Sequence, residues 1–172
     1  KIRELKDLVR YKTKLTRQVS SEKNRFVKIL EDANIKLSSV LTDIFCVTGM
    51  KMIREIIECD YDPDKLLYHV HGSVKKSRSE IKEAITGYVT DHHRFMMQTI
   101  LESIEKTEDI IAKIDSQIAE QTKEYGLEIE LLETIPGVGH DGAIGIISEI
   151  GVDMSVFPDE KHIAKWAGMC PG

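Results

Sequence analysis

Residues 91–125 read DHHRFMMQTILESIEKTEDIIAKIDSQIAEQTKEY, and this stretch decides the fold. It contains neither glycine nor proline, and apolar side chains recur in it every seven residues. The recurring residues are Met97, Ile104, Ile111, Ile118 and Tyr125. A second position three residues further on is apolar at Ile100 and Ile114 and polar at Thr107 and Gln121. This spacing predicts one long helix with a coiled-coil seam, and we expect Gly126 to end it.

Another long helix is predicted over residues 1–36, where apolar residues follow alternating steps of three and four from Leu5 to Leu37. Residues 1–28 contain ten basic and three acidic side chains, a net charge of +7. Residues 99–133 contain three basic and ten acidic ones, a net charge of −7. Opposite charge favours an antiparallel pair of these two helices. A coiled coil between two copies, through Met97, Ile104, Ile111 and Ile118, is equally compatible with the pattern.

Short helices are predicted between the long ones, over residues 38–90. Ser38 or Ser39 could cap a short helix through Leu41, Ile44, Phe45 and Val47, which Gly49 is expected to end. Asp62 with Pro63 is expected to begin another. Ser79 is expected to cap a helix over 80–86 without a capping box, because Lys82 stands three residues further on. The sequence therefore predicts an all-α fold in which long antiparallel or coiled-coil helices bracket short ones.

The stretch at residues 134–151 reads TIPGVGHDGAIGIISEIG and predicts a helix–hairpin–helix module. The backbone N–H groups around Gly137, Val138, Gly139 and His140 would suit one phosphate. The other interpretation is an ordinary turn between helices that needs glycine. A short helix over 159–167 follows a loop in which we expect Val156 and Phe157 to pack back. Two domains are predicted, residues 1–126 and residues 127–172.

Five basic residues share one stripe of the first long helix. They are Arg3, Lys6, Arg10, Lys14 and Arg17. Such a stripe can follow the phosphates of a nucleic-acid backbone. It can equally be a solvated face, or a face paired with the acidic helix.

Several classes of protein are excluded or disfavoured by the sequence. It has no run of eighteen apolar residues and no basic-then-apolar leader, so we expect a cytoplasmic protein with no membrane span. Its three cysteines share no metal-type spacing and are expected to be reduced thiols. The histidine pairs at 69 and 71 and at 92 and 93 lack further ligands. We predict no catalytic set, metal site or cofactor in this chain.

Three stretches together resemble one family of insertion-sequence transposases. The first has RELKDL at 3–8, RY at 10–11 and EKNR at 22–25, and the second has LEDANIKLSSV at 30–40 with GM at 49–50. The third has IPGVG at 135–139, EIG at 149–151, Phe157 and WAGMCPG at 166–172. The family carries a RuvC-like DEDD nuclease domain and a serine-containing transposase domain, and a structured RNA guides its recombination. The second and third stretches are the most specific.

The resemblance implies a fragment of a longer enzyme. The four acidic residues, with their divalent metal such as Mg²⁺, would precede Lys1, and the catalytic serine would follow Gly172. None of Ser38, Ser39, Ser148 and Ser155 stands at the family's serine motif. The long helices resemble the family's coiled-coil region, through which protomers associate.

Two functions are therefore consistent with the sequence. The first is part of a transposase that positions DNA by its backbone and associates with other copies, with a structured guide RNA as a further partner. The alternative is a purely structural dimerisation module whose hairpin makes no contact with nucleic acid.

Overall fold

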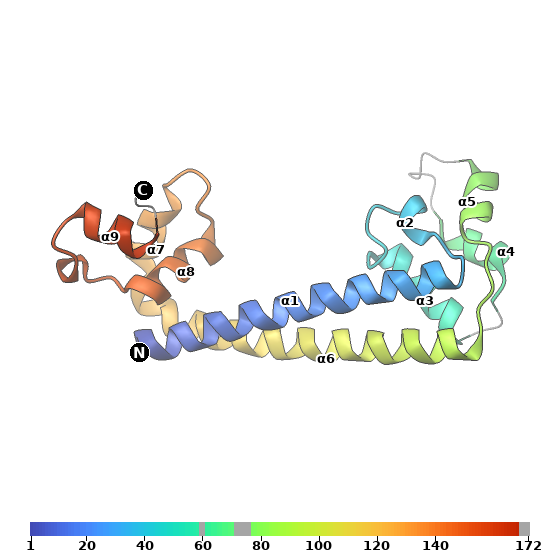
Figure 1. Cartoon of the computed structure of the whole chain (residues 1–172), viewed down its shortest axis with the longest axis horizontal. Coiled ribbons are helices and arrows are strands. Elements are labelled where there is room, and N and C mark those ends of the chain that lie inside the picture. Colours follow the sequence, from blue (N-terminus) through green and yellow to red (C-terminus); the bar gives the residue numbers. More distant parts are fainter. Residues whose placement is uncertain (59–60, 71–76, 169–172) are drawn as a thin grey trace. The chain divides into compact units, whose positions relative to one another are not determined.

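The computed structural model describes residues 1–58, 61–70 and 77–168, and its regular elements there are all helices (Figure 1). In order they are α1 (Ile2–Asp32), α2 (Leu37–Val40), α3 (Val47–Glu58), α4 (Pro63–Leu66), η1 (Leu67–His69), α5 (Arg78–Ala84), α6 (Asp91–Thr122), η2 (Lys123–Tyr125), α7 (Gly126–Glu133), α8 (His140–Ile150), η3 (Met154–Val156) and α9 (Glu160–Trp166). The three η elements are short 3₁₀ helices. The predicted all-α fold is confirmed. No helix in the described ranges is long and apolar enough to span a membrane.

The chain divides into two compact units. Unit 1 comprises Lys1–Lys14 and Ile111–Gly172, and unit 2 comprises Leu15–Ile110. Helices α1 and α6 each contribute one segment to each unit. The predicted domain boundary after residue 126 falls inside unit 1 and stays a prediction.

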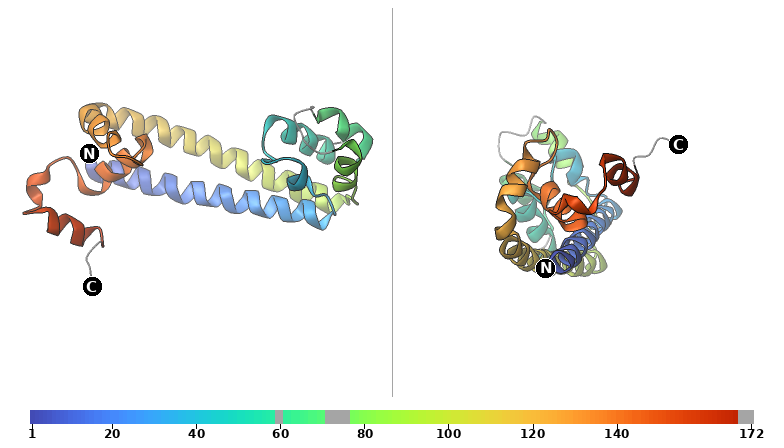
Figure 2. Two further views of the ribbon diagram at one scale, coloured as in Figure 1. Left: turned by 90° about the horizontal axis from the view of Figure 1, so that it is seen from above. Right: turned by 90° about the vertical axis from the view of Figure 1, so that its left-hand side faces the viewer.

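In unit 2 the segments of α1 and α6 lie side by side and run antiparallel (Figures 1 and 2). The direction follows from two contacts, because Asp32 lies 3.0 Å from His93 while Lys23 lies 2.8 Å from Glu108. The largest fully buried side chains between and around these segments include Phe26, Leu30, Met97 and Ile104. Helix α3 adds the buried residues Met52, Ile53 and Ile56. The short helices thus complete a core that two long helices alone would leave open.

Residues 41–46 of unit 2 contain no helix, so the predicted helix through Leu41, Ile44, Phe45 and Val47 is wrong. Helix α2 ends before it, and neither Ser38 nor Ser39 caps a helix there. Leu41 and Ile44 are nevertheless buried. Gly49 does not end a helix but lies in the first turn of α3. A Cβ atom there would lie 2.0 Å from the carbonyl oxygen of Ile44. Glycine at 49 therefore lets the irregular segment approach α3 closely.

The helix starts in unit 2 follow side-chain caps. The Asp62 carboxylate accepts a hydrogen bond from the N–H of Asp64 and Pro63 opens α4, which confirms the predicted start. Helix α5 is capped by Ser77 instead of Ser79. The Ser77 hydroxyl accepts from the N–H of Glu80, and the Glu80 carboxylate accepts from the N–H of Ser77. The prediction of no capping box is therefore wrong, and the box closes two residues earlier.

In unit 1 the long helix does not end at Gly126. Helix α6 ends at Thr122, one 3₁₀ turn follows, and Gly126 opens α7 in a right-handed helical conformation. The glycine is permissive for a left-handed stop but does not impose one, so that prediction is wrong. Ion pairs again set an antiparallel direction, with Lys12 2.7 Å from Asp115 and Lys1 3.2 Å from Glu124.

The heptad seam of α6 is buried within the chain. Met97 and Ile104 are buried in unit 2, Ile118 is buried in unit 1, and Ile111 is half-buried. Thr107 is buried as well, and its hydroxyl donates to the carbonyl of Ser103. The intramolecular packing that the pattern allowed is therefore present, and association through the same seam stays a prediction.

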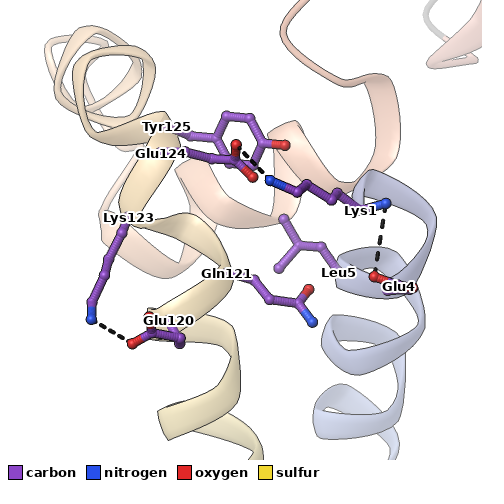
Figure 3. A pocket seen from close by; sticks show the side chains of 8 residues that line it. All are labelled: Lys1, Glu4, Leu5, Glu120, Gln121, Lys123, Glu124 and Tyr125. Carbon is purple, nitrogen blue, oxygen red and sulfur yellow. Dashed lines mark hydrogen bonds and ion pairs between the residues drawn. The ribbon is translucent and has the colours of Figure 1, made fainter.

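Gln121 occupies the last polar position of the seam, beside a pocket of about 360 Å³ at the end of the helix pair in unit 1. Figure 3 shows its side chain reaching from α6 toward α1, next to Leu5. Its Oε1 atom is buried and has no hydrogen-bond partner among the described residues. The charged groups around the pocket pair with one another, as Lys1 does with Glu124 and Lys123 with Glu120.

Candidate nucleic-acid interface

The turn between α7 and α8 has the geometry that Pro136 and Gly137 favour. The N–H of Val138 donates to the carbonyl of Ile135 at 3.0 Å, which closes a four-residue turn. Gly137 has a φ of 91°, and proline followed by a glycine of positive φ is the pattern of a type II turn. Helix α8 then begins after Gly139. The turn is thus built locally, as the sequence predicts.

Gly139 is the N-cap of α8 and provides no side chain to cap it. Its backbone is extended, with a φ of −91°, so any residue could adopt this conformation. A Cβ atom there would meet nothing within 4 Å. Neither the backbone nor the packing of the described chain requires glycine at 139. An exposed, uncapped helix start without a side chain leaves its N–H groups open to an external anion.

Carboxylates surround the same turn. Glu133, at the end of α7, lies 2.8 Å from Nδ1 of His140. Asp141, in the first turn of α8, lies 3.2 Å from Nζ of Lys12. Both carboxylates weaken the attraction that the helix dipole offers to a phosphate. The turn alone is therefore a modest anion site and depends on basic groups nearby.

The basic stripe of α1 lies partly in contact with α8. Lys6 and Arg10 both bind Glu149, in the last turns of α8. Hydrogen bonds from Arg10 and then from Lys6 hold the pKa of Glu149 below its ordinary value. The same carboxylate raises the pKa of Arg10, through its hydrogen bond first and its charge second. These two members of the stripe are paired within the chain, with α8 instead of the acidic part of α6.

The other predicted members of the stripe are exposed. Arg3 and Lys14 belong to unit 1, and Arg17 belongs to unit 2. None of the three forms an ion pair with the described residues. On α1, Arg3 lies about one turn before Lys6, and Lys14 about one turn after Arg10. Unit 1 thus presents two unpaired cations that flank two paired ones.

Lys12 is a basic residue that the stripe did not include. It lies on the inner side of α1 and contacts both Asp115 of α6 and Asp141 of α8. Burial disfavours its charged form, but hydrogen bonds to the two aspartates outweigh that effect and raise its pKa. Its place at a gap in the apolar pattern was the only sequence signal for this role.

Two apolar surfaces of unit 1 have no cover within the described chain. Leu127 and Leu131 of α7 are 81% and 69% exposed, and Ile135 lies beyond them. A groove of about 440 Å³ between α8 and α9 is lined by Gly145, Ile146 and Ile163, among others. Val156 is exposed as well, so the expectation that it packs back is wrong, while Phe157 is half-buried.

The described residues contain no group of three or more histidine, cysteine or acidic side chains that could hold a metal ion. Cys46 is a free thiol, and Cys59 and Cys170 lie outside the described residues.

Comparison with known proteins gives one match. Residues 129–172 match the sequence model of the Transposase IS116/IS110/IS902 family. The matched segment begins within α7 and includes the turn, α8 and α9. No curated protein and no solved structure matches the chain. The match supports a transposase-related role, and it places the turn and Glu149 inside the segment that carries the likeness.

Proposed function

We propose that this chain is a helical part of an insertion-sequence transposase, followed by the beginning of its transposase domain. The observation that carries the proposal is the family match over residues 129–172. The finer likeness noted in the sequence extends the proposal to a RuvC-like nuclease segment before Lys1 and a catalytic serine after Gly172. In that arrangement a structured RNA guides recombination, and strand cleavage and joining take place outside this chain.

Within that enzyme, the proposed task of unit 1 is to position DNA by its backbone. The contact between Lys6 and Glu149 joins the matched segment to the basic stripe of α1. Arg3 and Lys14 extend this surface with unpaired charge, and Gly139 leaves the start of α8 open. Contacts of this kind recognise phosphates without reading bases.

Binding of duplex DNA at low and moderate salt tests this proposal. Arg3→Ala and Lys14→Ala should weaken binding to all sequences alike, and each should reduce the salt slope by about one. Lys113→Ala is the matched control, because Lys113 is an exposed lysine of unit 1 on the other long helix. Gly139→Ala should also weaken binding. The fold of this variant should be unaffected, since the added methyl group has no neighbour within 4 Å.

A different outcome would favour the alternative, a structural module that does not contact nucleic acid. If the chain shows no salt-dependent binding of DNA or of structured RNA, the contact with nucleic acid is abandoned. The chain is then a structural module, and self-association measured by sedimentation becomes its proposed role. We propose self-association for the transposase as well, so association alone does not distinguish the two functions.

A further inference from the structure

Lys6 and Arg10 converge on a single carboxylate. The Nε atom of Arg10 donates to Oε1 of Glu149 at 2.8 Å, and Nη2 donates to Oε2 at 3.1 Å. The Nζ atom of Lys6 lies 2.8 Å from the same Oε2. Four residues separate Lys6 and Arg10 on α1, so helical geometry sets their side chains next to each other. The planar guanidinium group of Arg10 and the ammonium group of Lys6 thus surround one carboxylate.

This arrangement is not specific for a carboxylate. Guanidinium forks bind carboxylate and phosphate oxygens in the same two-pronged way, and an ammonium group adds charge without a directional demand. Glu149 comes from a helix far along the chain, 139 residues after Arg10.

The pair of Arg10 and Glu149 is accessible from solvent. The Arg10 side chain is 63% exposed and the Glu149 side chain 29% exposed, so a phosphate can approach the fork from solvent. Ion pairs that solvent reaches contribute at most about 1 kcal/mol of net stability, so opening this pair should cost the fold little. Arg3 and Lys14 flank the two paired cations and have no partner among the described residues. They would add attraction for a polyanion but not for a single carboxylate.

We propose that Lys6 and Arg10 form an oxyanion site, which Glu149 occupies in the free protein and a backbone phosphate of duplex DNA occupies in the complex. This inference rests on the proposed function and adds a built-in competitor to it. DNA must displace Glu149 to use the two central cations of the surface. Affinity in the unmodified chain is therefore lower than its basic stripe would allow.

Glu149→Gln tests the site, because it removes the charge and nearly preserves the shape. We expect duplex DNA to bind several-fold more tightly at low salt, with a salt slope larger by about one to two phosphate contacts. Glu130→Gln is the matched control, since Glu130 is an exposed glutamate on α7 of the same unit. The gain from Glu149→Gln should disappear when Arg10→Ala is added.

The outcomes separate the two proposals. If Glu149→Gln behaves like Glu130→Gln while Arg3→Ala and Lys14→Ala weaken binding, the oxyanion site is overturned and the DNA contact remains. If no variant binds DNA, both fail. The unmodified chain provides a second measurement, in case Glu149→Gln misfolds. The Nε–H resonance of Arg10 should shift when duplex DNA is added, and an unchanged resonance overturns the site.

Discussion

Gly49 and Gly145 differ in what surrounds the missing side chain. A Cβ atom at Gly49 would lie 2.0 Å from a backbone oxygen, whereas one at Gly145 would meet nothing within 4 Å. Gly49→Ala should therefore destabilise the fold by about 1–3 kcal/mol or more, as overpacking does. Gly145→Ala should stabilise α8 by up to about 1 kcal/mol, because alanine favours helix. Urea denaturation of both variants checks the pair, and equal effects would contradict the close approach at Gly49.

Glu149 should also leave a signature in the pH dependence of stability. Its pKa is lower in the folded chain than its ordinary value, because Arg10 and Lys6 donate to the carboxylate. The resulting stabilisation is present above the unfolded pKa of about 4.3 and is lost as the pH falls through the folded pKa. Denaturation measured from pH 6 to pH 2 should therefore show a shallower acid loss for Glu149→Gln than for the unmodified chain. Identical acid profiles would mean that the pair does not persist in solution.

Helix α5 is the element whose N-cap residue differs from the one that the sequence predicts. Ser77→Ala removes the hydroxyl that caps the helix, and such losses cost about 0.5–2 kcal/mol. Ser79→Ala should have a much smaller effect, since among the described residues the Ser79 hydroxyl hydrogen-bonds only with that of Ser77. Denaturation of the two variants decides which serine is the cap. A larger loss for Ser79→Ala would restore the expectation from the sequence.

Elements with long, regular patterns could be predicted, and irregular ones could not. The repeat from Met97 to Ile118 identified α6, and Asp62 with Pro63 identified the start of α4. Residues 41–46 are apolar enough for a helix, but their burial is achieved without one. The sequence contains the capping box as Ser77 and Glu80, but Ser79 is an equally plausible cap from the sequence alone.

The candidate site also has a part that the sequence predicts and a part that it does not. The turn at Pro136 and Gly137 depends on local sequence and was predicted. The contact of Lys6 and Arg10 with Glu149 joins residues more than a hundred positions apart, and charge patterns do not specify such partners. Net charge favours the acidic part of α6 as the partner of the stripe, but Lys6 and Arg10 pair with Glu149 of α8 instead.

For the whole molecule, the burial of the heptad seam has a measurable consequence. Ile104→Ala should destabilise the chain by about 2–5 kcal/mol, because it leaves a cavity in the core of unit 2. Leu131→Ala, on the exposed face of α7, should change the stability by less than about 0.5 kcal/mol. Denaturation gives these values, and sedimentation of the same variants reports association. If Ile104→Ala lowers the oligomeric state without loss of stability, the seam packs between copies instead.

Unit 1 is built from two segments that are far apart in the sequence, so one of them is synthesised well before the other. Unit 2 is one continuous stretch, whereas unit 1 combines the first fourteen residues with those from Ile111 onward. At about 5–20 residues per second, the ribosome needs roughly 7–30 s to reach Glu149 after Arg10. Until then Lys6 and Arg10 lack Glu149, their partner in the folded chain. The nascent chain should therefore bind nucleic acid more tightly than the finished protein, and the formation of α8 should lower that affinity.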